Sequence, residues 1–219
     1  MTASGPSPAS GPSPKRVPLI GLIGPIGCGK SPVAGWLAER GAAVIDADEL
    51  TLELMAPGTP LTEAIVDHFG PEFRRPDGSL DRAALGRLVF SDPASLAELE
   101  ALVHPVFDER LQRLMEELSA AGPTAVVLEA IKLVEAGQAA ACDEVWLIVC
   151  DPDAQLARLI GRGMTESDAR QRVAAQADSL SSWAAAATRV IRTDGPPAAV
   201  ERAVDAAFEE ALTRIRAPK

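Results

Sequence analysis

The sequence GPIGCGKS at residues 24–31 constrains this chain more than any other stretch. It fits the pattern GxxxxGK(S/T), follows an apolar run at residues 19–23 and precedes a helical pattern. Its glycines allow backbone N–H groups to turn inward around a polyphosphate, and the next helix adds the positive end of its dipole. A chance glycine-rich turn is the alternative, but the flanking strand and helix leave it little room. We therefore predict a phosphate-binding loop.

Within this loop, Lys30 is expected to reach the β- and γ-phosphates of a nucleotide, and the Ser31 hydroxyl is expected to hold Mg²⁺. The expected nucleotide-binding residues are Gly27, Cys28, Gly29, Lys30, Ser31, Pro32 and Val33.

The composition predicts a single domain. A chain of 219 residues with 47% apolar content can bury one sizeable core, or one core with a small lid attached. The net charge of −10 argues against a nucleic-acid groove, which needs clustered Lys and Arg. The three cysteines have no metal-binding spacing and form no even disulfide set, so we expect free thiols in a reducing cytoplasm.

No apolar stretch is long enough to span a bilayer, and the first residues lack the order of a signal peptide, so we expect no membrane partner. Residues 1–14 repeat Ser, Gly and Pro with almost nothing to bury. We interpret residues 1–16 as a disordered tail, with a docking tail as the alternative, and residues 17–219 as one domain.

Apolar runs alternate with helical patterns, which predicts an α/β fold with a parallel sheet covered on both faces. We expect strands at 19–23, 42–45, 124–128, 144–149 and 190–191. Helices are expected at 31–40, 61–69, 93–118, 155–162 and near 200–215. Pro105 removes one helical hydrogen bond, so we expect it to kink or split its helix.

Acidic residues follow two of the expected strands. Asp46 and Glu129 end their strands and should project toward the loop, because ligands bind outside the carboxyl ends of parallel strands. A carboxylate placed there can accept a hydroxyl proton from a phosphoryl acceptor, which indicates a small-molecule kinase. Either Asp46 or Asp48 should cap the next helix, and we favour Asp46 for the chemistry because it ends the strand.

The motifs together resemble one family, dephospho-coenzyme A kinase, from about residue 19 to residue 195. The loop is common to many families, whereas the ordered combination is specific. The matching segments are GLIGPIGCGKS (21–31), VIDAD (44–48), PGTP (57–60), FG (69–70), DGSLDR (77–82), VF (89–90), LE (99–100), HP (104–105), QLARL (155–159) and the spacing from Arg172 to Gln176.

This resemblance implies a P-loop kinase fold with a five-stranded parallel sheet, a helical acceptor-binding insertion at about 50–120 and a lid at about 162–184. It implies that ATP phosphorylates the ribose 3′-hydroxyl of dephospho-coenzyme A, in a monomer or weak homo-oligomer. Lys30, Asp46 and Arg162 would be catalytic. The acceptor side would include Asp46, Arg82 and His104. From this chain's own residues we also expect Glu129 there, and Lys132 as an added charge that the family pattern lacks. A surface ion pair for Arg82, a core position for His104 and a solvated side chain for Arg162 are the structural alternatives.

Some positions depart from the family pattern, mostly where the nucleotide would bind. Pro32 stands where threonine is usual, and Thr188 and Thr193 stand where aspartate and asparagine are usual. Residues 129–135 replace a pattern that begins with aspartate, and a basic lid residue is lost near Ser182. Two alternatives therefore stay open: a catalytically weakened protein that binds nucleotide or coenzyme A, and a nucleoside monophosphate kinase-like enzyme.

Overall fold

The computed structural model describes residues 16–217, which form a five-stranded parallel sheet in the order β2-β3-β1-β4-β5. The strands are β1 (Leu19–Ile23), β2 (Ala43–Asp46), β3 (Val126–Glu129), β4 (Glu144–Val149) and β5 (Arg189–Arg192). All five predicted strands are therefore confirmed, with shifts of one or two residues at some ends. Of the expected tail at residues 1–16, only Arg16 is described, and it pairs with Asp143 at 2.8 Å.

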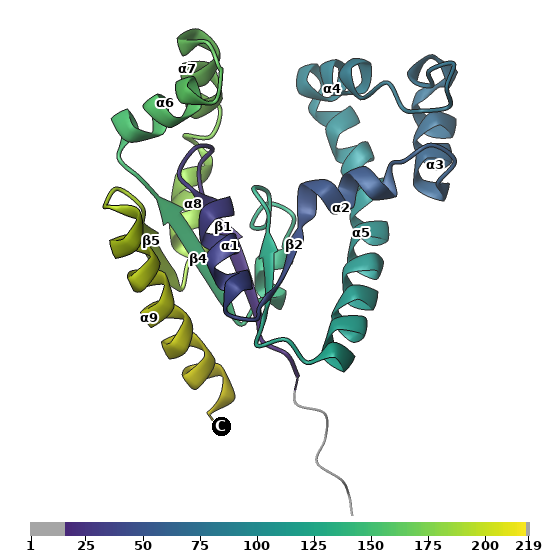
Figure 1. Ribbon diagram of the computed structural model, residues 1–219. Helices are drawn as coiled ribbons and strands as arrows, with labels where there is room; N and C mark the ends of the chain where they lie inside the picture. Colours follow the sequence, from purple (N-terminus) through teal and green to yellow (C-terminus); the bar gives the residue numbers. More distant parts are fainter. Residues whose placement is uncertain (1–15, 218–219) are drawn as a thin grey trace, which may run out of the picture.

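Helices cover both faces of this sheet (Figure 1). Ile20 and Leu22 of β1 pack on one face with α1 (Lys30–Glu39) and α9 (Pro197–Arg216). Leu19 and Ile23 pack on the other face with α5 (Pro93–Ala121) and α8 (Ser179–Ala186). Since alternate residues of one strand are buried on opposite faces, the run is continuously apolar, as parallel strands require.

A separate cluster of helices stands beside the sheet. It consists of α2 (Ala47–Leu54), α3 (Pro60–Phe69), α4 (Arg82–Ser91) and the first half of α5, joined by a short 3₁₀ turn at Pro71–Phe73. Its own apolar core includes Leu61, Ile65 and Leu85. Across the carboxyl edge of the sheet lie α6 (Pro152–Gly161) and α7 (Glu166–Ala174) (Figure 1).

Helix starts follow the expected capping chemistry. Asp92 is the N-cap of α5, and Pro93 is the first residue of that helix. The Asp92 side chain accepts hydrogen bonds from the N–H groups of Ala94 and Ser95. Of the expected kink or split at Pro105, the split is wrong, because α5 runs unbroken over 29 residues. Pro105 is exposed, while Phe107 and Leu111 on the same helix are buried against the sheet, so packing offsets the lost hydrogen bond.

The expectation of unpaired cysteines is also wrong. Cys28 and Cys150 form a disulfide across 122 residues of sequence, and Cys142 is free. β1 and β4 are neighbours in the sheet, so the loop after β1 lies above the end of β4. Sequence spacing carries no sign of this, because it depends on the strand order.

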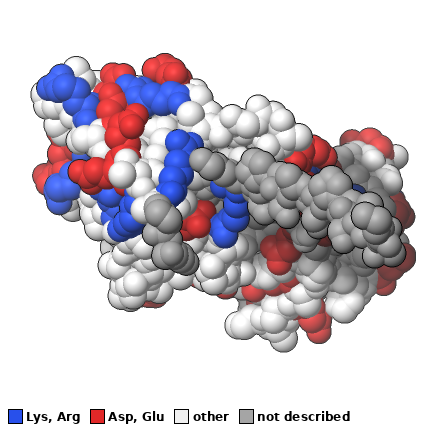
Figure 2. All heavy atoms as spheres, turned by 90° about the horizontal axis from the view of Figure 1, so that it is seen from below, with Lys and Arg blue, Asp and Glu red and all other residues white. Residues whose placement is uncertain are grey.

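The end of the molecule opposite the loop has a mixed charge distribution. Figure 2, seen from below, shows Lys and Arg side chains lying beside Asp and Glu on the part that grey atoms leave visible. Buried Glu144 accepts a hydrogen bond from Trp146 Nε1 at 2.6 Å and pairs with Arg189 and Arg214. Among the helices of residues 16–217, none has the length and apolar character that a bilayer crossing requires.

Candidate active site

The loop at residues 24–31 connects β1 to α1 at the carboxyl edge of the sheet. Gly24, Gly27 and Gly29 adopt φ angles of 143°, 80° and 94°, which other residues rarely adopt. A Cβ on Gly24 would lie 2.2 Å from the carbonyl oxygen of Ile148, so only glycine fits there. The glycine requirement of the motif therefore has both a conformational and a steric cause.

Two glutamines hold the tip of this loop. The carbonyl of Ile26 accepts a hydrogen bond from Gln155 Nε2 at 2.7 Å, and its N–H donates to Gln176 Oε1 at 2.8 Å. Gln155 is buried on α6, and Gln176 follows α7. The loop is thus connected to α6, which precedes the expected lid at about 162–184, and to Gln176 within that segment. Sequence reasoning noted the spacing that includes Gln176 but assigned neither residue a contact.

Lys30 lies under the loop with its side chain nearly buried. Its Nζ donates to the carbonyl oxygens of Gly24 at 2.8 Å and Pro25 at 3.4 Å. Burial lowers the pKa of Lys30, and the nearby carboxylates, Glu129 foremost, oppose that shift. An ammonium that is partly desolvated and hydrogen-bonded to neutral carbonyls is well suited to bind an incoming phosphate.

A cavity of about 210 Å³, which we call the loop cavity, lies in front of Lys30. Three carboxylates line it together with Ser31 and Arg162. They come from neighbouring elements, because Asp46 at the end of β2 lies in register with Glu129 at the end of β3, and Asp48 follows in α2. Of the sequence-predicted residues, Lys30, Ser31, Asp46, Glu129 and Arg162 are therefore brought together.

Hard oxygen donors in the loop cavity fit Mg²⁺. The Ser31 hydroxyl donates to Glu129 Oε1 at 3.1 Å. Partial burial raises the pKa of Glu129, and the charges of Asp46 and Asp48 add to that rise, so a cation would relieve the crowding. Residues 16–217 hold no cluster of three or more acidic, His or Cys side chains that could form a metal site alone. Mg²⁺ needs no such cage, since it commonly takes one or two protein oxygens and completes its shell with phosphate and water.

Asp46 and Asp48 have different roles in the local structure. Asp46 Oδ1 accepts hydrogen bonds from the N–H groups of Asp48 at 2.8 Å and Glu49 at 3.1 Å, so Asp46 caps α2. Partial desolvation, with a further contribution from Asp46, raises the pKa of Asp48. Asp48 is the carboxylate that lines the loop cavity and also the larger cavity beside it. The geometry therefore favours Asp48 over Asp46 for contact with an acceptor.

These roles predict opposite effects on stability. Because the folded-state pKa of Asp48 is raised, its ionised form is disfavoured in the native protein. Protonated Asp48 therefore contributes to the stability of the folded protein. This contribution is fully present below the pKa of the unfolded chain and is lost as the pH rises through the folded-state pKa. We expect Asp48→Asn to raise the melting temperature at pH 7 and to have no effect below about pH 4, close to the ordinary pKa of aspartate.

The matched variant is Asp46→Ala, which removes the cap of α2 and should lower the free energy of unfolding by about 1 kcal/mol. Thermal unfolding of both variants between pH 3.5 and 8 checks the pair. A lower melting temperature for Asp48→Asn at pH 7 would contradict the assignment.

The larger cavity, which we call the helical cavity, has a volume of about 480 Å³. α2, α4, α5 and the segment after β3 line it, and its polar lining includes Arg82, His104 and Lys132 as expected. Lys132 Nζ pairs with Glu100 at 3.2 Å across the cavity wall. Arg82 is exposed, and its neighbour Asp81 pairs with Arg75, so the expected alternative of an Arg82–Asp81 ion pair is not what the structure contains.

A third cavity of about 230 Å³, the outer cavity, lies on the other side of the loop. Apolar groups dominate its lining: Pro32, Trp36, Pro197 and Val200. Gly29 and Arg162 line both this cavity and the loop cavity, while Asp48 is shared by the loop and helical cavities. The three cavities therefore form a continuous row with the loop at its centre.

Two of the expected nucleotide-binding residues lie outside this row. Val33 is fully buried in the core, and its N–H donates to the carbonyl of Gly29 at 3.3 Å. Cys28 is 1% exposed, its sulfur is in the disulfide and its N–H donates to Pro25 at 3.3 Å. Sequence position alone put both in the motif, whereas their side chains face the sheet.

The threonines that depart from the family pattern have defined partners. Thr193 Oγ1 donates to the carbonyl oxygen of Cys28 at 2.6 Å, and Arg158 donates to Thr193 Oγ1 at 3.1 Å. Thr188 Oγ1 accepts from the N–H of Val145 at 2.9 Å, away from all three cavities. Thr193 therefore supports the loop, and Thr188 connects β4 to the start of β5.

Comparisons with known proteins agree with this arrangement. A family model described as dephospho-CoA kinase matches residues 18–197. A dephospho-CoA kinase of Symbiobacterium thermophilum is 46% identical over 194 residues, which cover 88% of this chain and 81% of that protein. One from Streptomyces avermitilis is 44% identical over 200 residues, covering 91% and 96%. The crystal structure of TT1252 from Thermus thermophilus superposes with a TM-score of 0.74 at 36% identity, covering 90% of this chain and 98% of that one.

Proposed function

Since the chain belongs to the dephospho-coenzyme A kinase family, we propose that it transfers the γ-phosphoryl group of ATP to the ribose 3′-hydroxyl of dephospho-coenzyme A. The observation that carries this proposal is the continuous row of cavities. The outer cavity suits the base of the nucleotide, the loop cavity suits its phosphates, and the helical cavity is large enough for an acceptor. Asp48, between the last two, would be next to the reacting hydroxyl.

In the proposed reaction, the ribose 3′-oxygen attacks the γ-phosphorus, the bond to the oxygen of ADP breaks, and the hydroxyl proton moves to Asp48. Lys30 and Arg162 stabilise the negative charge on the phosphoryl oxygens, which is the main task of a protein in this chemistry. Asp46 fixes the start of α2 and so positions Asp48.

Ser31 and Glu129 would hold Mg²⁺, which neutralises phosphate charge when it is bound. Arg82, His104 and Lys132 supply positive or hydrogen-bonding groups for the anionic acceptor. We place this activity in the cytoplasm, with dephospho-coenzyme A as the partner and a monomer or weak homo-oligomer as the working unit.

A coupled assay of ADP release tests the function. With dephospho-coenzyme A, millimolar ATP and Mg²⁺, we expect steady turnover that depends on the acceptor. Nucleoside monophosphates in its place should give none. ADP release only with a monophosphate would support the monophosphate kinase alternative. Binding of ATP or coenzyme A without turnover would support the catalytically weakened alternative, which the replacements at Pro32 and Thr193 favour.

Pro32 provides a test of the nucleotide site. It lies in the first turn of α1 and lines the outer cavity, and its ring removes an N–H that could donate to a phosphate. Proline is tolerated in the first turn of a helix, so Pro32 should not lower the stability of α1. We expect Pro32→Thr to tighten binding of a non-hydrolysable ATP analogue roughly ten- to hundredfold, since a hydrogen bond to a charged group contributes about 1.5–3 kcal/mol.

Calorimetric titration of both proteins with the analogue and Mg²⁺ measures this difference. Equal dissociation constants would mean that other loop N–H groups make up for the missing one.

A further inference from the structure

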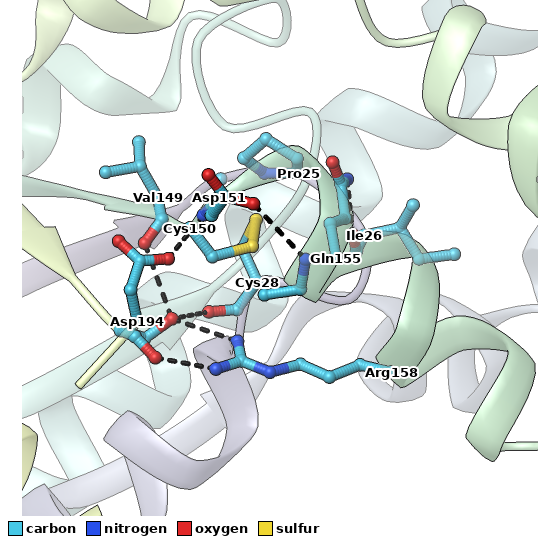
Figure 3. Close-up of a disulfide and its surroundings, with 12 residues drawn as sticks. Pro25, Ile26, Cys28, Val149, Cys150, Asp151, Gln155, Arg158 and Asp194 are labelled. Carbon is cyan, nitrogen blue, oxygen red and sulfur yellow. Dashed lines mark hydrogen bonds between the residues drawn. A yellow bond between two sulfur atoms is a disulfide. The ribbon is translucent and has the colours of Figure 1, made fainter. Parts of the chain in front are cut away.

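The disulfide joins the phosphate-binding loop to the central sheet. Cys28 immediately precedes Gly29 and Lys30, and Cys150 directly follows β4. Figure 3 shows Cys28 and Cys150 side by side, with Val149 and Asp151 next to Cys150 and with Arg158 and Asp194 nearby. Among residues 16–217, the third cysteine, Cys142, lies at the other end of β4. The pair therefore forms a defined two-cysteine site next to the nucleotide site.

The sulfur atoms lie behind the loop and not in the nucleotide site. Gly27 and Gly29 line the loop cavity, whereas Cys28 between them does not. With the bond formed, both glycines keep positive φ angles and the loop cavity is open. The oxidised loop is therefore compatible with phosphate binding.

Hydrogen bonds from the residues around the disulfide hold the loop. Thr193 supports the carbonyl of Cys28, and Arg158 of α6 also donates to the Thr193 carbonyl at 2.6 Å. Asp151, next to Cys150, caps α6 through the N–H of Asp153 at 2.9 Å, and Gln155 on that helix binds Ile26 (Figure 3). The disulfide adds a covalent bond between the loop and Cys150, the residue just before the N-cap of α6. Arg162 is the C-cap of the same helix.

We propose that Cys28 and Cys150 are a redox-sensitive pair whose disulfide preorganises the loop for nucleotide, so that reduction weakens nucleotide binding. This inference rests on the proposed function for the identity of the ligand. The physical reason is that a loop without the disulfide samples more conformations. The free-energy cost of ordering the loop then reduces the affinity for the nucleotide. A link across 122 residues should also restrict the unfolded chain, so oxidation should raise the melting temperature.

The chemistry uses a hydroperoxide as oxidant. Cys150 is half-buried and Cys28 almost fully buried, so the Cys150 thiolate is the group that a peroxide reaches. It attacks the peroxide oxygen to form a sulfenic acid and releases water with hydrogen peroxide as the oxidant. The Cys28 thiolate then attacks the Cys150 sulfur and displaces a second water. Two thiols thus lose two electrons and two protons, and a dithiol reverses the step by exchange.

The test uses the full chain in two states, treated either with hydrogen peroxide or with dithiothreitol and then freed of reagent. Titration in denaturant should find one thiol in the oxidised protein and all three in the reduced protein. Calorimetry with ADP and Mg²⁺ should give a dissociation constant that is roughly three- to tenfold larger after reduction, which means weaker binding. The melting temperature without nucleotide should fall by roughly 5–10 °C.

Matched variants separate this pair from other effects. Cys150→Ser should show the ADP affinity and melting temperature of the reduced protein after either treatment, with two thiols in both states. Cys142→Ser should change its ADP affinity and melting temperature on reduction as the unmodified chain does, with no thiol when oxidised and two when reduced. Three thiols after peroxide treatment would overturn the proposal, as would an ADP affinity that is equal in both states. The thiol count and the melting temperature do not depend on kinase activity. A negative ADP-release assay would therefore contradict the proposed function without deciding whether the cysteine pair is redox-sensitive.

Discussion

Replacement of Lys30 by alanine is expected to lower phosphoryl transfer at least about a hundredfold, because one aimed charge or donor at the transition state commonly contributes that much. The Lys30 ammonium is bound to the carbonyls of Gly24 and Pro25 and faces the loop cavity. We therefore expect Lys30 to bind phosphate and to contribute little to the stability of the core. The coupled ADP-release assay at saturating dephospho-coenzyme A measures the loss.

Lys30→Met is the matched variant, because it keeps a buried unbranched side chain and removes the ammonium with its two hydrogen bonds. Since burial lowers the pKa of Lys30, loss of the charge should leave the free energy of unfolding little changed. Arg202→Ala removes a positive charge from an exposed position on α9 and is the control for net charge. Turnover of Lys30→Met close to that of Arg202→Ala would contradict the site assignment.

Asp48→Asn is expected to lower kcat by about 10²–10⁴-fold while ATP affinity changes little, because a general base acts in the transition state. Asp48 is shared by the loop and helical cavities, and its raised pKa favours proton acceptance. Asp46→Asn is the matched variant. Asparagine caps helices about as well as aspartate, so α2 should keep its start, and we expect a loss in kcat of less than about tenfold.

Single-turnover rates and separate ATP titrations on both variants decide between the two aspartates. A larger loss in kcat for Asp46→Asn would support the assignment made from sequence, with Asp46 as the base. A loss of ATP affinity alone, in either variant, would instead identify that residue as part of the Mg²⁺ shell.

Local sequence patterns were sufficient to predict the strands and the start of α5. The bounds of β1 and β4 were predicted to the residue, and Asp92 with Pro93 marked the start of α5. These features depend on apolar runs, capping side chains and glycine conformations, all of which act over a few residues. The phosphate-binding loop belongs to the same class, because its strand, glycines and helix are contiguous in the sequence.

The sequence by itself thus determined the five strands, the loop and the kinase family. Only the tertiary structure decided that Cys28 bonds to Cys150, that Gln155 and Gln176 hold Ile26, and that Asp48 lies between two cavities. Each of these depends on the strand order β2-β3-β1-β4-β5 or on how helices pack above it. Residues more than 100 positions apart meet there because strands adjacent in space are distant in sequence, and no local spacing records that distance.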